Sequence, residues 1–206
     1  MKLGASVGGL LLASAVLAQT WPDKTIRMIV PFPPGGGTDI MARFIGQKLT
    51  DRLGQQVIID NRGGAGGNIG TGLAARAPAD GYTLLVDPGS TITVNPSLFS
   101  KLPFDPLKDF APISLMAINP YVVVVNPAQP IHTIQDLISV AKSKPGQLTF
   151  ASSGAGQTTH IAGELFMLKT GVVITHVPYK GGGPAIVDTV GGQTSFMFGN
   201  MGSVLP

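Results

Sequence analysis

The sequence contains no cysteine, one glutamate (Glu164) and three scattered histidines. Without thiols the chain has no disulfide framework, no cysteine nucleophile and no thiolate metal site. The histidines show no His-Glu-x-x-His spacing, and a pair of catalytic carboxylates would have to come from dispersed aspartates. The formal charge is only +3 and no run of lysine or arginine occurs, so we expect no nucleic-acid partner.

Familiar enzyme motifs are also missing. No Gly-x-Gly-x-x-Gly follows a predicted strand, although residues 63–70 superficially suggest one. No Gly-Lys-Ser/Thr marks a phosphate loop, and no Gly-x-Ser-x-Gly marks a nucleophile elbow, because the one match to that pattern, at residues 4–8, follows no predicted strand. None of these motifs therefore supports an enzyme of these classes.

The composition itself is that of a globular protein. Hydrophobic residues make up 44% of the chain and charged residues 12%. The 28 glycines and 17 prolines separate apolar segments and form no low-complexity tract, which argues against disorder. With 206 residues the chain is long enough to bury a substantial core.

The amino-terminal residues are typical of a secretory signal peptide. Lys2 precedes an uncharged, apolar stretch over residues 3–18, which ends in small residues. We predict cleavage after Ala18 and a periplasmic mature protein; the alternative is an uncleaved anchor, although sixteen residues are short for a membrane span. No later segment is apolar and long enough to cross a bilayer.

The stretch over residues 30–39, Val-Pro-Phe-Pro-Pro-Gly-Gly-Gly-Thr-Asp, organises the first half of the chain. A β-branched run over 26–30 predicts a buried strand before it, and apolar spacing predicts a helix after it, with Ile40, Met41, Phe44, Ile45, Leu49 and Leu53 on its buried side. Glycines let a ligand approach backbone N–H groups closely, Thr38 is expected to cap the helix, and helix starts favour anions. The stretch therefore predicts a receptor for an anionic group, most simply a carboxylate; the alternative is a connection without a ligand.

Strands and helices alternate along the rest of the chain. Further strands are predicted at 56–60, 82–86, 121–125, 148–151, 174–179 and 194–198, and helices at 68–76, after Thr133, around Ile161 and at 184–190. Thr133 and Asp136 form a capping-box pair. The valine run at 122–125 predicts a strand that is buried on both faces. Three prolines between 102 and 112 indicate a crossing, so the pattern predicts two α/β lobes with mostly parallel sheets, at 19–106 and 107–206.

Small residues follow several strands, where open α/β sheets bind ligands. Each candidate has a structural alternative: Phe32 contributes to the core or lies over the ligand, and Asp39 caps its helix or accepts from a ligand amine or hydroxyl. His160 is either a structural hydrogen-bond partner or a site residue. Lys180 either binds a carboxylate or is simply solvated, and Asn200 either donates to a ligand or makes a turn.

Several motifs resemble those of the Bug family, the periplasmic receptors of tripartite tricarboxylate transporters. They are Trp-Pro-Asp-Lys at 21–24, the stretch at 30–39, Asn-Arg-Gly-Gly-Ala-Gly-Gly-Asn-Ile-Gly at 61–70, Asp-Gly-Tyr-Thr-Leu at 80–84, Asn-Pro-Ser-Leu at 95–98, His-Ile-Ala-Gly-Glu at 160–164 and Val-Pro-Tyr-Lys-Gly at 177–181. The resemblance spans essentially the whole chain after the signal peptide. It implies a two-lobed type II periplasmic-binding-protein fold that closes over a small carboxylate, with no catalysis and no cofactor.

The resemblance also implies site residues and partners. Ligand contacts are expected from both lobes, at Phe32, Pro34, Gly35, Gly36, Thr38, Asp39, Ser90, Thr91, Ser153, Gly154, Thr158 and His160, with Tyr179 and Lys180 at the rim. Expected partners are two integral membrane subunits, although many members lack an adjacent transporter, and a monomer is expected. Two departures stand out: members of the family usually continue with a carboxyl-terminal segment that completes the first lobe, so we expect that lobe to be incomplete here, and Gly199 replaces the usual aspartate before Asn200.

Two other function classes compete with the receptor. An enzyme acting on the same carboxylate would use Asp39 and His160 for proton transfer and would need both within hydrogen-bond reach of one ligand. An interaction module without a ligand would have a closed, apolar space between its lobes.

Overall fold

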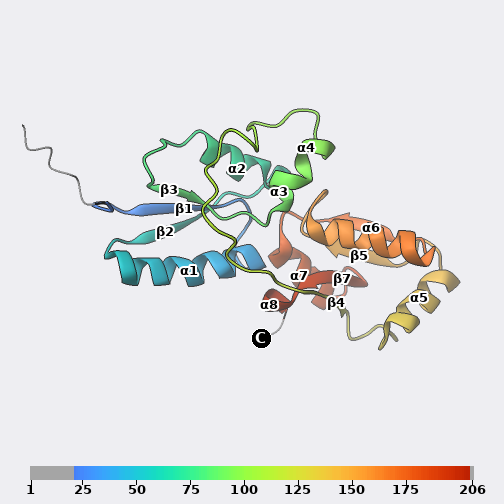
Figure 1. Cartoon of the computed structure of the whole chain (residues 1–206). Helices are drawn as coiled ribbons and strands as arrows, with labels where there is room; N and C mark the ends of the chain where they lie inside the picture. The colour runs from blue at the N-terminus through green and yellow to red at the C-terminus, as the bar shows by residue number, and fades with distance from the viewer. Residues whose placement is uncertain (1–20, 205–206) are drawn as a thin grey trace, which may run out of the picture.

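The computed structural model describes residues 21–204, which form two α/β units joined by a long crossing segment (Figure 1). The predicted signal peptide and its cleavage site lie outside the described residues. The strands are β1 (Ile26–Val30), β2 (Val57–Asn61), β3 (Thr83–Leu85), β4 (Tyr121–Val125), β5 (Thr149–Ser152), β6 (Thr175–Pro178) and β7 (Phe196–Asn200). The helices are α1 (Gly37–Leu53), the 3-10 turn η1 (Ala65–Gly67), α2 (Asn68–Ala75), α3 (Ser90–Thr93), α4 (Asn95–Leu98), α5 (Ile134–Ser143), α6 (Thr158–Thr170), α7 (Gly182–Val190) and α8 (Met201–Val204).

Lobe I, as we use the term here, is the three-stranded sheet and its helices. Its strand order is β2-β1-β3, and both pairings are parallel, as the strand–helix alternation predicts. The central strand β1 has Ile26, Met28, Ile29 and Val30 at 2% exposure or less, because helices cover the sheet it lies in. The turn at 31–36 therefore leaves a fixed, buried strand and enters α1 directly.

The predicted buried side of α1 is only partly right: Met41, Ile45, Leu49 and Leu53 are half-buried, and Leu49 packs on the lobe I core. Ile40 and Phe44 are 41% and 58% exposed, whereas Asp39, Ala42 and Gly46 are the buried residues of the helix. The reason is close packing: a Cβ at Gly46 would lie 3.1 Å from Ile59 Cδ1, so the small-residue face is the one that fits against the sheet. Hydrophobic side chains consequently remain on the outside of lobe I.

Lobe II is the four-stranded sheet and its helices, with strand order β4-β7-β5-β6. Only β4 runs antiparallel, paired with β7, so the sheet is mostly parallel as predicted. As an edge strand, β4 is half-buried and not buried on both faces, which corrects the expectation from its four valines. The predicted capping box is confirmed: Thr133 Oγ1 accepts from Asp136 N at 3.1 Å and Asp136 Oδ2 accepts from Thr133 N at 2.9 Å.

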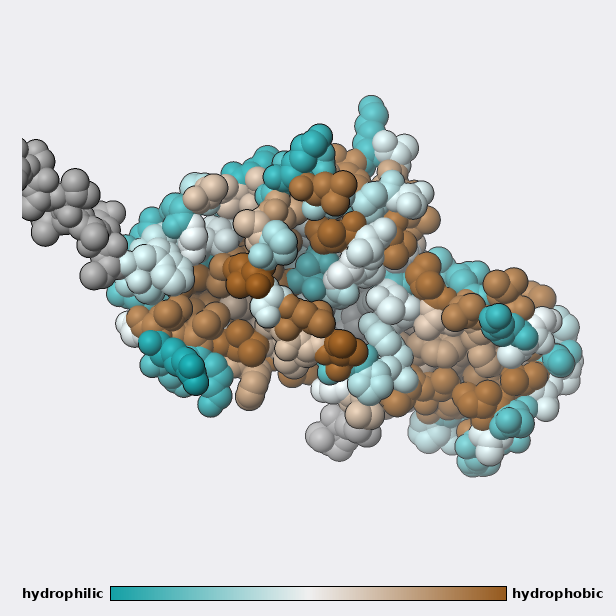
Figure 2. All heavy atoms as spheres, in the orientation of Figure 1, coloured by the Kyte–Doolittle hydropathy of each residue, from teal (hydrophilic) through white to brown (hydrophobic). Residues whose placement is uncertain are grey.

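The crossing between the two sheets, residues 101–120, contains no helix or strand. It exposes Leu107, Ile113, Leu115 and Ile118, each by more than three quarters. In the space-filling view, hydrophobic residues gather on the face over which this segment runs (Figure 2). None of the helices within residues 21–204 is long and apolar enough to span a membrane.

Candidate functional site

The two lobes meet where two glycine turns touch. A Cβ added to Gly36 of lobe I would lie 3.7 Å from the backbone nitrogens of both Gly182 and Gly183 in lobe II. At Gly183 an added Cβ would lie 2.9 Å from the carbonyl oxygen of Pro34. We call this contact between residues 33–37 and 181–183 the glycine junction. Only residues without side chains allow the two backbones to approach this closely.

Both sides of the glycine junction are helix amino-terminal ends. The 17-residue α1 begins at Gly37 and the nine-residue α7 at Gly182, and neither has a side-chain cap. Such ends carry partial positive charge and N–H groups without helical partners. Two ends of the same sign repel one another, and an anion between them would relieve that repulsion. Lobe II also brings Asn200 here, since a Cβ on Gly37 would lie 2.9 Å from the Asn200 Cγ.

Thr38 does not cap α1, contrary to the prediction. The cap residue is Gly36, and Thr38 is the second residue of the helix. Phe32 takes the first of its two predicted roles, because it is 6% exposed and packs in the lobe I core with Met28 and Val86.

The carboxylate of Asp39 is fully engaged within lobe I. Its Oδ2 accepts from Gly35 N at 3.0 Å and from Arg43 Nε at 2.9 Å, while Oδ1 accepts from Asn61 Nδ2 at 2.9 Å. Burial alone would raise the pKa of Asp39, but these hydrogen bonds and the Arg43 charge together lower it. Asp39 is therefore a charged group that fixes the turn before α1, rather than a free acceptor for a ligand.

A second contact between the lobes joins residues that the sequence places far apart. Ser90 Oγ donates to Gln157 Oε1 at 2.7 Å, and Gln157 Nε2 donates to the carbonyl oxygen of Gly66 at 2.8 Å. Thr91 and Asn95 are completely buried nearby in lobe I, and among the described residues Thr91 Oγ1 and Asn95 Oδ1 have no hydrogen-bond partner. Ser90 and Thr91 were predicted from the sequence, but Gln157 was missed. Its position between a glycine turn and a helix is the sequence feature that could have identified it.

The lobe II turn uses its own backbone donors, which corrects the expectation that they face a ligand. Ser153 N donates to Thr159 Oγ1 at 2.8 Å, and Gly154 N donates to Ser152 Oγ at 3.1 Å. Gly154 has φ +133° and lies beside Gly66 of lobe I, so the turn still contributes to the interface. Thr158 is half-buried at the start of α6.

His160 makes its polar and stacking contacts within lobe II. Its Nδ1 accepts from Gly156 N at 3.1 Å, its Nε2 lies 3.2 Å from Glu164 Oε1, and its ring stacks on His176 with the centroids 4.0 Å apart. Burial and the neighbouring His160 lower the pKa of His176 to about 4. Asp39 and His160 share no hydrogen-bond partner among residues 21–204, so the structure does not unite the proposed acid and base.

The two rim residues differ in role. The hydroxyl of Tyr179 donates to Asp188 Oδ2 at 2.8 Å, and burial together with this bond raises the pKa of the tyrosine. This hydrogen bond connects Tyr179, which precedes the glycine junction in the sequence, to α7. Lys180 is exposed, as its solvated alternative predicts.

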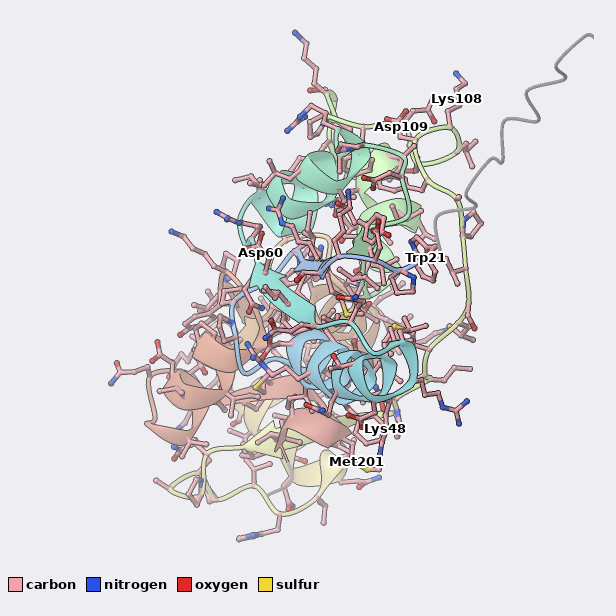
Figure 3. The ribbon with its side chains drawn as sticks, turned by 90° about the vertical axis from the view of Figure 1, so that its left-hand side faces the viewer. Trp21, Lys48, Asp60, Lys108, Asp109 and Met201 are labelled. Carbon is pink, nitrogen blue, oxygen red and sulfur yellow. The ribbon has the colours of Figure 1, made fainter. Side chains whose placement is uncertain are left out.

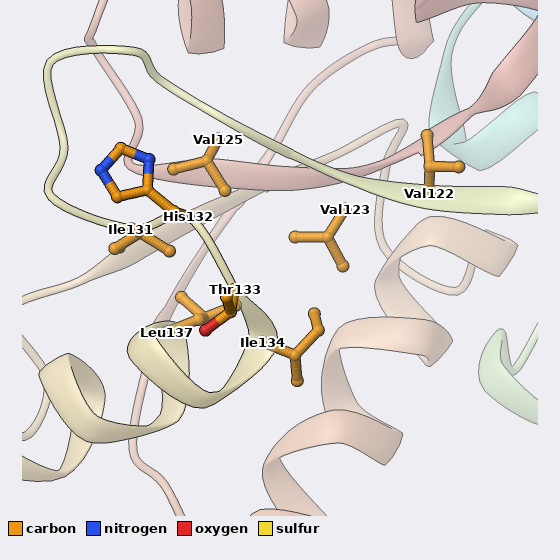
Figure 4. A pocket seen from close by; sticks show the side chains of 8 residues that line it. All are labelled: Val122, Val123, Val125, Ile131, His132, Thr133, Ile134 and Leu137. Carbon is orange, nitrogen blue, oxygen red and sulfur yellow. The ribbon is translucent and has the colours of Figure 1, made fainter.

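Two hollows accompany these contacts. One, of about 550 Å³, lies beside the glycine junction and is lined by residues 33–35 of lobe I, residues 183–184 and 186–188 of α7, and Ser203. The other, of about 320 Å³, is an apolar groove between β4 and the start of α5, lined by valines, Ile131, Ile134 and Leu137, with His132 and Thr133 at its edge (Figure 4).

Several other charged side chains lie on the outside of lobe I. Figure 3 shows Asp60 on β2 and Lys108 and Asp109 on the crossing segment, at the outside of lobe I. Asp60 is paired with Arg27 and Arg62. Within residues 21–204 no three His, Asp or Glu side chains gather in a way that could hold a metal ion.

Comparison with known proteins agrees with this architecture. The model of the tripartite tricarboxylate transporter family receptor (TctC) matches residues 41–206. Protein BugT of Bordetella pertussis is 45% identical over 94% of this chain and 60% of its own length. Among solved structures, R. palustris Rpa4515 with adipate has a TM-score of 0.86 at 38% identity, covering 89% of this chain and 61% of that one.

A second solved structure, MatC (Rpa3494) from Rhodopseudomonas palustris with bound malate, has a TM-score of 0.82 at 33% identity and covers 89% of this chain and 62% of that one. The chain thus spans about three fifths of the length of the proteins it matches.

Proposed function

Because the chain belongs to the tripartite tricarboxylate transporter receptor family, we propose that it is a periplasmic solute-binding protein that captures a small carboxylate between its two lobes. Its relatives are receptors and not enzymes, which argues against proton transfer by Asp39 and His160. The integral membrane subunits of a tripartite tricarboxylate transporter are the proposed partners. We keep the proposed lobe boundaries at 19–106 and 107–206, with hinge closure about the crossing near residues 102–112.

The glycine junction is the observation that carries this proposal. Two helix amino-terminal ends approach each other there through glycines and present backbone N–H groups. A carboxylate has two oxygens and one negative charge, so it suits a site with donors on both sides and positive potential from each. We propose that N–H groups at 36–37 and 182–183, helped by the Asn200 amide, hold this carboxylate.

The chemical class of the ligand follows from the same donors. Backbone N–H groups recognise the carboxylate and not the rest of the molecule, so chain length and substituents are read elsewhere. Adipate and malate, which the two solved relatives contain, are both dicarboxylates, and we propose a dicarboxylate of this size range. Thr91 and Thr158 remain candidates for contacts beyond the first carboxylate, whereas the Ser90 hydroxyl is engaged by Gln157.

The test compares two neighbouring glycines of α7. A Cβ at Gly183 would lie 2.9 Å from the Pro34 carbonyl oxygen and must push the lobes apart, whereas a Cβ at Gly182 would come no closer than 3.9 Å to lobe I. We expect Gly183→Ala to weaken adipate or malate binding at least about tenfold, and Gly182→Ala to leave it nearly unchanged, by titration calorimetry. Equal affinities in both variants, or binding of no carboxylate by the unmodified chain, would refute the proposed site.

A further inference from the structure

Gln157 is a polar residue in an unusual place. It is the cap residue of α6 in lobe II, yet it is 1% exposed and its carboxamide extends into lobe I. There its Nε2 donates to the Gly66 carbonyl oxygen at 2.8 Å, and its Oε1 accepts from Ser90 Oγ at 2.7 Å. A buried carboxamide is costly unless it is paired, and this one is paired at both ends by the opposite lobe.

The surrounding backbone is shaped to admit this side chain. Gly66 has φ +61°, and an added Cβ there would lie 3.2 Å from the Ala155 carbonyl oxygen of lobe II. A Cβ at Gly154 would lie 4.0 Å from the Cα of Gly66. The two glycine turns therefore pack backbone to backbone, and Ser90, itself 5% exposed, closes the remaining side of the carboxamide.

We propose that Gln157 is a clasp that holds the two lobes in the closed form and thereby sets how tightly the site retains its ligand. The expected effect on ligand affinity rests on the proposed function, whereas the expected effect on lobe closure does not. The clasp shares no residue with the glycine junction, so it stabilises closure without contacting the carboxylate. Observed affinity scales with the fraction of molecules in the binding-competent form, so loosening the clasp weakens every ligand by the same factor.

The size of the effect follows from what opening does to these groups. In the open form water can pair with both ends of the carboxamide, so each bond is exchanged and not simply lost. We therefore expect removal of both bonds to shift the closed-to-open ratio about tenfold, equivalent to ~1.4 kcal/mol. Removal of one bond by Ser90→Ala should shift it less.

The absence of cysteine allows a direct measurement. Lys48→Cys on α1 and Lys144→Cys after α5 place one spin label on the exposed surface of each lobe. Double electron–electron resonance then gives the distribution of distances between the two spin labels in the ligand-free protein. In this background we compare Gln157→Leu, which keeps the volume but not the bonds, with Ser90→Ala and with Gln147→Leu, an exposed control in lobe II.

The expected result is a longer interlobe distance in Gln157→Leu, an intermediate distribution in Ser90→Ala and none of this change in Gln147→Leu. Adipate and malate affinities should fall by the same factor, up to about tenfold, in Gln157→Leu. Unchanged distances in both Gln157→Leu and Ser90→Ala would overturn the clasp. If the unmodified chain binds no carboxylate, the proposed function fails, whereas the ligand-free distances still decide the clasp.

Discussion

Replacing Asp87 with asparagine is expected to stabilise the protein at neutral pH. Asp87 follows β3 in lobe I, and its carboxylate accepts from Gly89 N at 2.9 Å and from Thr71 Oγ1 at 3.2 Å. Burial outweighs these two bonds and raises the pKa of Asp87 from 3.8 to about 6. Asparagine cannot ionise and keeps both contacts, since its carbonyl accepts from Gly89 and its amide donates to Thr71.

The sign and size of the effect follow from proton linkage. The unfolded chain releases the Asp87 proton near its ordinary pKa and the folded chain only near pH 6, so between about pH 4 and 6 the folded state binds more protons. Stability is therefore lost as the pH rises through this window. With a pKa difference of about two units, ionisation of Asp87 lowers the free energy of unfolding by at most about 3 kcal/mol at pH 7.5. Near pH 4 the same effect is less than ~1 kcal/mol. Because Asp87 is not fully shielded from solvent, we expect roughly 1–3 kcal/mol at pH 7.5.

Urea unfolding of the parent chain and Asp87→Asn at pH 4 and pH 7.5 measures this. The stability difference between the two proteins should grow with pH by the amounts above. The pKa of His176 is lowered to about 4, so its protonation destabilises the folded protein as the pH falls, which is the opposite pH dependence. This contribution is the same in both proteins and cancels from the difference between them. If the two proteins differed by the same unfolding free energy at both pH values, the raised pKa of the buried Asp87 carboxyl would be refuted.

Two further substitutions test the packing and the site. Gly163→Ala should destabilise the chain by about 1–3 kcal/mol in urea unfolding, because its Cβ would clash with the buried Phe150 ring; an unchanged midpoint would contradict this packing. Asp39→Ala should release the Gly35 N–H and weaken adipate and malate binding by similar factors in calorimetry, whereas a selective loss of one ligand would restore Asp39 as a direct ligand contact.

The fold was predictable because its signals are local. The apolar run of β1, the turn into α1 and the Thr133–Asp136 capping box each depend on residues within a few positions of one another, and the structure contains all three. The predicted strands fall within one or two residues of the observed ones. Alternation of strand and helix then implies parallel sheets with little further information.

The site was harder to predict because its determinants are not local. Which face of α1 packs on the sheet depends on Gly46 meeting Ile59, a contact that hydrophobic periodicity does not encode. Likewise the N–H groups of the lobe II turn are the right kind of donor, but Ser152 and Thr159 already accept from them. Counting donors in a sequence therefore overestimates those that remain for a ligand.

In the proposed receptor, binding of the carboxylate and closure of the lobes depend on different contacts with different chemistry. The glycine junction offers backbone donors and helix-end charge, which attract any carboxylate but select weakly among them. The Gln157 contact offers neutral hydrogen bonds between lobes, which favour closure whatever the ligand is. A receptor built this way can change ligand preference through residues between the two contacts, because neither the carboxylate grip nor the closing contact depends on them.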